Sequence, residues 1–265
     1  MISSNDCDRD ISTLMTVERG LKVLRAFRSN RAPLTNAELV LRTGLPKATV
    51  SRLTSTLVQA GFLRLVPGKR GFELSTGALG IGHAYLATND LLNEARPLLQ
   101  ELADRLDVSV ALGIQDGVEM LYVDYRVSRK VATLRLGVGS VLPMSTTSIG
   151  RAYLWGLPEP EQLSLIEEHK RLAGPQAEAL ESAIHASFRE LETTGTCAVL
   201  AGFQRNTYGV SLPVCLGQNR TLMAMSCGKA DVDLDLKSVR EHIAPALTET
   251  AERLQAQLAN SSYCL

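Results

Sequence analysis

The sequence has few of the features that mark secreted, membrane or metal-binding proteins. Its 265 residues include five cysteines, an odd number with no C-x-x-C pair, so neither a disulfide framework nor a metal cluster is predicted. No apolar run approaches the roughly 18 residues that a membrane span needs. The first ten residues, MISSNDCDRD, are polar and acidic, unlike a secretory signal. We therefore expect a cytoplasmic protein with no membrane partner and no bound metal.

Signatures of catalysis are missing as well. The chain holds no G-x-S-x-G, H-E-x-x-H, P-loop or G-x-G-x-x-G pattern. A thiol catalyst needs a thiolate beside a base or a cation, and the four histidines fall in predicted helices, far in sequence from the cysteines. The sequence thus predicts no catalytic residue and no cofactor.

The formal net charge is zero, but the charge is unevenly distributed. Residues 11–75 carry eleven Lys and Arg against three Glu, a net charge of +8. Residues 1–10 sum to −2 and residues 76–265 to −6, which restores the total of zero. A neutral chain with one strongly basic segment concentrates positive potential there, and this favours a nucleic-acid partner.

The basic segment contains a helix-turn-helix pattern. Thr35, with Glu38 three residues later, forms a capping box that starts one helix, and Gly44 ends that helix. Pro46 suits the first turn of a second helix, which runs to Ala60 with its apolar residues on one stripe. The other face is basic, rich in hydroxyls and mostly short-chained, as a helix that enters a major groove requires. That face carries Ser51, Arg52 and Ser55, with Lys47 and Thr49 beside it.

A β-hairpin follows, and its turn carries two cations, Lys69 and Arg70. With a third helix predicted over residues 17–27, the segment forms a winged helix-turn-helix. The alternative is a helix-turn-helix fold whose polar face is only solvated and touches no nucleic acid. The local charge of +8 favours DNA binding.

The composition divides the chain into four parts. They are a disordered tail over residues 1–14, the winged helix-turn-helix domain over 15–75, a linker helix over 76–90 and a second domain over 91–260. The linker contains Gly77, Gly80 and Gly82, which weaken an isolated helix but permit close helix–helix approach. We expect it to pack at a dimer interface; a loosely ordered connector is the alternative.

The second domain alternates helices and strands. A helix over residues 91–106 precedes two strands joined by an Asp116-Gly117 turn, a strong hairpin signal. The remaining predicted elements are a strand over 131–142, a helix that opens at 145–150, two helices within 159–194, strands over 197–203, 208–215 and 221–228, and a helix over 236–258. Six strands with helices around them define an α+β class.

Several of these segments resemble one family. TVERGLKVLRAF, GLPKATVSRLTSTLVQAGFL and GFELSTGALGIG resemble the N-terminal domain of IclR-type transcriptional regulators, and EARPLLQELAD and VGSVLPMSTTSIGRAYL resemble the effector domain of that family. The resemblance implies a winged helix-turn-helix joined by a linker helix to a GAF-like antiparallel-sheet domain. It also implies a homodimer or homotetramer that binds operator DNA, as repressor or activator, and senses a small metabolite, often an organic or aromatic acid.

The resemblance also implies roles for individual residues. Lys47, Thr49, Ser51 and Arg52 would read the operator, with Ser55 on the same face and with Lys69 and Arg70 as contacts from the wing. The effector candidates are Met144, Ser145, Thr146, Thr147, Ser148, Arg205, Gly209, Ser211, Met225 and Ser226, with Leu112 and Met223 as further apolar lining. A helix that starts at 145–148 offers unpaired N–H groups to a carboxylate or phosphate. The alternatives are that Ser145 or Thr146 only caps the helix, that Arg205 is a solvated surface residue, and that the methionines only fill the core.

The chain departs from the family in part of the pocket. Where relatives usually carry an acidic stretch after the residue matching Gly195, residues 198–203 are apolar, and Gly209 occupies a position that is usually polar or cysteine. The wall should then be more apolar, which suits a compact molecule with a polar or acidic head and an apolar or aromatic body. The alternative is a second domain that only oligomerises and binds no effector.

Overall fold

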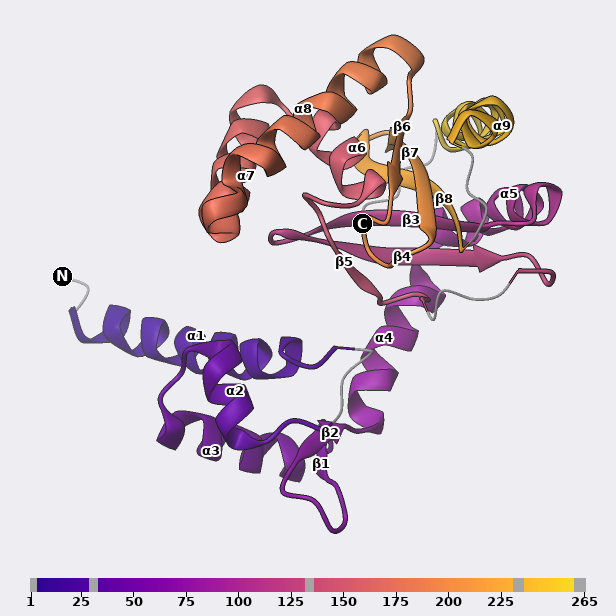
Figure 1. Ribbon diagram of the computed structural model, residues 1–265. Coiled ribbons are helices and arrows are strands. Elements are labelled where there is room, and N and C mark those ends of the chain that lie inside the picture. The colour runs from indigo at the N-terminus through magenta and orange to yellow at the C-terminus, as the bar shows by residue number, and fades with distance from the viewer. Residues whose placement is uncertain (1–3, 29–32, 132–135, 231–235, 260–265) are drawn as a thin grey trace. The chain divides into compact units, whose positions relative to one another are not determined.

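A computed structural model of the protein describes residues 4–28, 33–131, 136–230 and 236–259. The chain divides into two compact units, Met1–Thr88 and Asn89–Leu265 (Figure 1). In the described residues, no helix is long and apolar enough to cross a membrane.

The first unit is a three-helix core with a small hairpin and a further helix. Its elements are α1 (Ser4–Arg25), α2 (Asn36–Thr43), α3 (Lys47–Gln59), β1 (Leu63–Leu65), β2 (Phe72–Leu74) and α4 (Thr76–Thr88). The three helices and the hairpin close over one apolar cluster, in which Val23, Leu39, Val50 and Leu63 are buried. This is a winged helix-turn-helix, as predicted.

The start and end of α2 follow the predicted local chemistry. The Thr35 hydroxyl accepts the Glu38 N–H, and the Glu38 carboxylate accepts the Thr35 N–H at 2.8 Å. These hydrogen bonds from Thr35 hold the pKa of Glu38 below its usual value. Gly44 ends the helix with φ +66°, the left-handed conformation that favours glycine.

The first helix is longer than the sequence indicated. It begins at Ser4, within the segment expected to be a disordered tail, rather than near Val17. No glycine or proline occurs between Ser4 and Arg19, so the chain contains nothing that stops the helix from extending upstream.

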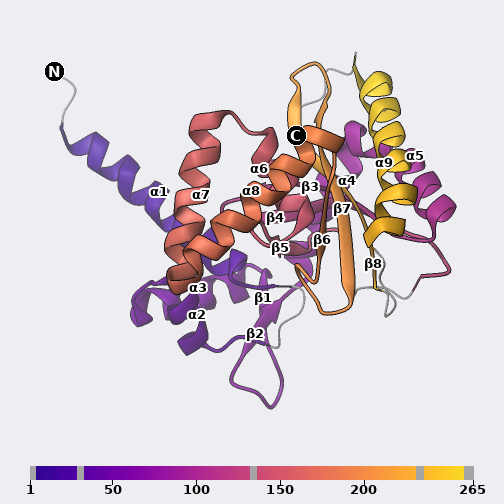
Figure 2. The ribbon, with the colours of Figure 1, turned by 45° about the horizontal axis from the view of Figure 1, so that its top comes forward.

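The second unit is built on a six-stranded antiparallel sheet with the strand order β5-β4-β3-β8-β7-β6. Its elements are α5 (Asp90–Leu106), β3 (Ser109–Asp116), β4 (Glu119–Val127), β5 (Val141–Pro143), α6 (Ser148–Gly156), α7 (Glu159–Ala173), a 3₁₀ turn (Gly174–Gln176), α8 (Ala177–Thr194), β6 (Cys197–Leu200), β7 (Thr207–Leu216), β8 (Thr221–Ala230) and α9 (Leu236–Leu258). Helices α5 and α9 cover one face of the sheet, and α6 lies on the other face with α7 and α8 (Figure 2).

Two strands are shorter than predicted. Of the strand expected over 131–142, residues 132–135 lie outside the described part, and β5 spans only Val141–Pro143. Gly139 has φ +83°, and the Ser140 N–H donates to Gly137 O, so the chain turns just before β5. Strand β6 ends at Leu200 because Ala201 adopts φ +53°, which bends the chain out of the sheet.

Candidate functional site

The outer face of α3 is open to solvent. Lys47, Ser51, Arg52 and Ser55 are exposed and Thr49 is half-buried, whereas Val50 on the opposite side is fully buried. Helical periodicity therefore separates the two faces as the sequence predicted. The N-cap is Pro46, which has no side-chain hydrogen bond to the helix, and the first turn holds no acid. The α3 start is thus suited to an anion such as a DNA phosphate.

The wing presents two more cations. Its strands pair Leu63 with Leu74 and Leu65 with Phe72, and an ion pair of 2.7 Å joins Arg64 to Glu73 across them. The carboxylate of Glu73 therefore compensates the positive charge of Arg64. Lys69 and Arg70, at the tip of the hairpin, are both exposed.

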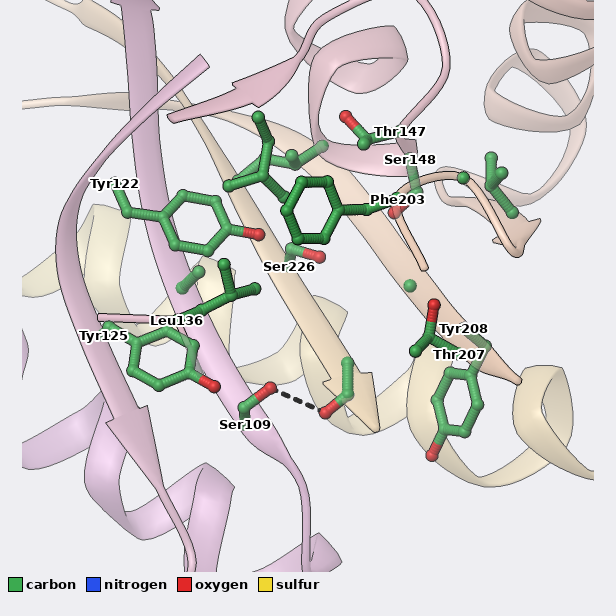
Figure 3. Close-up of a pocket in the computed structure, with 17 residues that line it drawn as sticks. Ser109, Tyr122, Tyr125, Leu136, Thr147, Ser148, Phe203, Thr207, Tyr208 and Ser226 are labelled. Carbon is green, nitrogen blue, oxygen red and sulfur yellow. Dashed lines mark hydrogen bonds between the residues drawn. The ribbon is translucent and has the colours of Figure 1, made fainter. Parts of the chain in front are cut away.

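The second unit contains a cavity on the sheet face beneath α6 (Figure 3). Two rows of paired residues cross the strands of this face and form its floor. One row is Tyr125–Ala111–Ser226, which continues outside the cavity to Ser211 and Cys197, and the next includes Ser109–Gly228–Gly209–Val199. Because most of these residues are small, the middle of the sheet is hollowed where larger side chains would fill the space under α6.

The walls of the cavity are aromatic, aliphatic and hydroxylated. Besides floor residues, they comprise Tyr122, Leu136, Leu142, Thr147, Ser148, Ile149, Gly202, Phe203, Thr207 and Tyr208. The space open to the centre of a water molecule is about 50 Å³. This is room for a few waters, so a ligand must be small or must displace the half-buried side chains of Leu136 and Phe203.

Four of the ten predicted effector residues line this cavity: Thr147, Ser148, Gly209 and Ser226. Thr147 is the N-cap of α6: its hydroxyl accepts the Gly150 N–H at 3.3 Å and donates to Pro143 O at 2.6 Å. A Cβ at Gly209 would collide with the Ser148 hydroxyl, so glycine here lets α6 approach the sheet.

Four other predicted residues lie beside the cavity and not in it. Ser211 is fully buried and donates to the Ser148 hydroxyl at 2.8 Å. The Ser145 carbonyl accepts the Arg151 Nε–H, and the Thr146 hydroxyl donates to Gly202 O at 2.9 Å. Met144 is fully buried in the core. These residues support the start of α6, whose N-cap is Thr147 and not Ser145 or Thr146.

Arg205 and Met225 lie apart from the cavity. Arg205 is exposed in the loop after β6. Met225 belongs to a row of paired residues, Asp124–Leu112–Met225–Leu212, whose side chains point to the opposite face of the sheet. Strand alternation therefore places Met225, Leu112 and Met223 on the face that α5 and α9 cover. The prediction that these three residues line the pocket is wrong.

The sequence analysis did not identify the two tyrosines of β4. Tyr122 and Tyr125 are three residues apart, so a regular strand would place them on opposite faces. The pairing shifts between Leu112 and Gly113, which leaves Val123 as an extra residue on β4. This bulge turns both rings toward the same face, where they stack with centroids 6.0 Å apart (Figure 3).

Chemical reactivity is low in and around the cavity. Burial raises the pKa of the Cys197 thiol to about 12, so Cys197 stays protonated at neutral pH. In the described part of the chain, no group of three His, Cys, Asp or Glu is placed to hold a metal ion.

The fold defines a class of protein: a winged helix-turn-helix domain followed by an α+β domain built on an antiparallel sheet. Two models of known families match the chain. Residues 16–67 match the IclR helix-turn-helix domain, and residues 83–256 match the family described as bacterial transcriptional regulator IclR C-terminal. The chain belongs to the IclR family of DNA-binding transcriptional regulators.

Individual relatives agree with this assignment. The chain is 29% identical over 246 residues to the HTH-type transcriptional regulator TsaQ1/TsaQ2 of Comamonas testosteroni, covering 92% of this chain and 88% of the relative. It is similar to a solved IclR-family regulator of Brucella abortus, with 31% identity, a TM-score of 0.83 and 91% coverage of both chains. An IclR homologue of Microbacterium hydrocarbonoxydans, solved in complex with 4-hydroxybenzoate, shares the fold at 18% identity and TM-score 0.65, covering 92% of this chain and 98% of the other.

Proposed function

We propose that this regulator binds its operator through α3 and the wing, and that a small molecule in the sheet-face cavity changes its operator affinity. The observation that carries the proposal is the contrast between the exposed cations of the first unit and the uncharged cavity of the second. Lys47, Arg52, Lys69 and Arg70 are all exposed. Such cations provide salt-dependent affinity for the DNA backbone.

Within this surface, base reading and backbone binding fall to different residues. Arg52 lies one turn into α3, where a side chain of a recognition helix reaches base edges, and Ser51 and Ser55 flank it. Lys47 and Thr49 lie in the first turn, near the N–H groups that suit phosphate. Lys69 and Arg70, on a separate hairpin, would follow the phosphate backbone from the wing.

A second copy of the chain is the proposed partner of α4. No side chain of this helix is buried, and Leu79 and Ile81 are 73% and 63% exposed. Gly77 is required within the unit, because a Cβ there would lie 2.8 Å from Gly61 O, but Gly80 and Gly82 face open space. Apolar side chains beside such glycines permit close packing against a copy of the same helix. A dimer would then place two α3 helices on an inverted repeat; association through the second unit would give a tetramer.

For the effector, the cavity favours a small molecule with an aromatic body and a polar head. Stacked Tyr122 and Tyr125, together with Phe203, provide aromatic surfaces, and the relative solved with 4-hydroxybenzoate supports an aromatic class. An organic or aromatic acid, the class expected from the sequence, would place its carboxylate at the start of α6. A hydroxyl head would instead bond to the side chains of the cavity.

The second candidate function is DNA binding with a second unit that only oligomerises. The small volume of the cavity, about 50 Å³, is the observation in its favour.

Selection of DNA sites from a random pool with the full-length protein, followed by anisotropy titration of the selected site with and without small aromatic ligands, separates the two functions. Our proposal predicts an inverted repeat whose affinity changes by at least fivefold with a ligand that calorimetry shows to bind. Enrichment of no sequence would contradict operator binding. An operator affinity that does not change at saturating ligand would support the second candidate function, in which the second unit only oligomerises.

A further inference from the structure

Among the residues that the structure describes, every polar side chain that lines the cavity is uncharged. The polar lining consists of hydroxyls, from Ser109, Thr147, Ser148, Thr207 and Ser226 and from Tyr122 and Tyr125. Tyr208 also borders the cavity, but its hydroxyl points away from it (Figure 3). No lysine, arginine, histidine, aspartate or glutamate is among the described residues that line it. A ligand that enters this cavity must therefore find its polar partners among hydroxyl and main-chain groups.

Two described arginines on the neighbouring elements, Arg151 and Arg205, are directed elsewhere. Arg151, on α6, donates from Nε to Ser145 O at 2.9 Å and from Nη1 to the Ser187 hydroxyl at 3.1 Å. Arg205 is exposed in the loop after β6. A carboxylate in the cavity would be removed from water with no cation beside it among the described lining residues, and buried charges are stable only when they are paired. The start of α6 offers only the partial charge of a nine-residue helix, and the Thr147 hydroxyl already caps it.

One polar atom in the cavity lacks a partner. The Tyr125 hydroxyl is buried and has no hydrogen-bond partner among the described residues. Ser109 lies near it and partly offsets the rise in its pKa that burial causes. The Ser109 hydroxyl donates its proton to Gly228 O at 2.7 Å (Figure 3), so it can serve Tyr125 only as an acceptor, and the lone pairs of the Tyr125 oxygen are left for a donor that enters the cavity. A buried hydroxyl is rarely left unpaired, so this atom needs a partner that enters the cavity.

We propose that the effector is an uncharged aromatic alcohol of about the size of a methylphenol, whose hydroxyl bonds to that of Tyr125. The proposal rests on the sensing function given above and specifies its ligand class. The ring lies against Tyr122 above the small residues of the floor, and it displaces the half-buried side chains of Leu136 and Phe203, because the space of about 50 Å³ alone holds only a few waters. A phenol with a pKa near 10 is neutral at pH 7, so it enters without the desolvation cost of an ion.

The hydroxyl group of the ligand also explains how the cavity would discriminate between aromatic molecules of similar size. A site that holds a buried polar group rejects an analogue without the matching group, because binding then leaves the polar group unpaired. The Tyr125 hydroxyl should thus favour 4-methylphenol over toluene, which has the same ring and methyl group without the hydroxyl. Benzoate, of similar ring size, should be rejected because of its charge.

Calorimetric titration of the full-length protein at pH 7 with 4-methylphenol, benzoate and toluene tests the proposal. We expect 4-methylphenol to bind at least tenfold more tightly than either of the others. Tyr125→Phe should weaken the binding of 4-methylphenol at least fivefold and should strengthen the binding of toluene, because no polar group is then left unpaired. Tyr208→Phe is the matched control, because Tyr208 lines the same cavity with its hydroxyl pointing away from Tyr122 and Tyr125 (Figure 3). A thermal melt of each variant verifies that it folds.

Three results would overturn the proposal, and they differ in what else they overturn. Tighter binding of benzoate than of 4-methylphenol would refute the neutral head and leave the sensing function intact. Equal affinity of wild type and Tyr125→Phe for 4-methylphenol would refute the role of the Tyr125 hydroxyl. Absence of binding below the millimolar range for all three probes would contradict the sensing function as well.

Discussion

The two units of this protein differ in where their functional residues lie. In the first unit the functional side chains are exposed, charged and carried by one helix and one hairpin. In the second unit the residues proposed to bind the effector are buried or half-buried, carry no charge among those described, and come from all six strands, the start of α6 and connecting loops. A surface of the first kind can be predicted from the periodicity and charge of a short stretch of sequence. A cavity of the second kind depends on which residues a sheet brings together, and this difference decides how each unit responds to substitution.

The largest expected effect is in the core of the second unit. Met225→Ala should lower the free energy of unfolding by about 2–5 kcal/mol, because it removes a fully buried side chain from the face of the sheet opposite the cavity. The relative affinities for 4-methylphenol and benzoate should stay as in wild type. Denaturant unfolding measures the stability, and calorimetry measures the two affinities. A change in ligand preference without a change in stability would show that Met225 faces the cavity.

Operator binding is expected to respond next. Arg52→Ala should lose about 1–3 kcal/mol on the selected operator and relax base preference, because the side chain is placed to reach base edges. Lys69→Ala is the comparison variant. It should weaken binding to specific and non-specific DNA alike, and it should reduce the slope of log affinity against log salt concentration by about one. Anisotropy titrations over a range of salt concentrations distinguish the two. Equal, sequence-independent losses would show that α3 is not the recognition helix.

These two predictions also show what the sequence does and does not determine. The capping box of Thr35 and Glu38, the glycine stop at Gly44 and the charge of α3 are local features, and the structure confirms the helices they predict. The order of strands and helices in the second unit followed from periodicity in the same way. Strand alternation was misread at Met225, since its face depends on its partners Leu112 and Leu212 across the sheet.

The sequence alone could not predict that Tyr122 and Tyr125 face the same cavity. Their common orientation depends on the bulge at Val123, which appears only when β4 is aligned with β3. A usable signal did exist on the floor, because Gly209, Ser226 and Gly228 are unusually small for the interior of buried strands.

A cavity-filling substitution sharpens the comparison between the units. Gly209→Val should abolish binding of 4-methylphenol, since a side chain at this position collides with the Ser148 hydroxyl and occupies the cavity. Overpacking should reduce stability by about 1–3 kcal/mol. Operator affinity without ligand should remain within about twofold of wild type, because α3 belongs to the other unit. Loss of operator binding in a folded Gly209→Val protein would contradict the division of roles.

The smallest effect concerns pH. His169, on α7, is buried, its Nε2 has no partner among the described residues, and burial lowers its pKa. The unfolded chain, with an ordinary value of about 6.5, therefore takes up this proton first, so stability is lost as pH falls below about 6.5. His169→Leu should reduce this acid-side loss, whereas His185→Leu, at an exposed position on α8, should preserve it. Thermal melts between pH 7.5 and about 5 compare the variants; an unchanged slope in His169→Leu would refute the assignment.

The central claim is that a ligand in the second unit controls DNA binding by the first. The most direct measurement is the dissociation constant of the selected operator, by anisotropy, with and without saturating 4-methylphenol, for wild type and Gly209→Val. We expect a change of at least fivefold in wild type and none in Gly209→Val. The same constant with and without ligand in wild type, under conditions where calorimetry shows that 4-methylphenol is bound, would contradict the account.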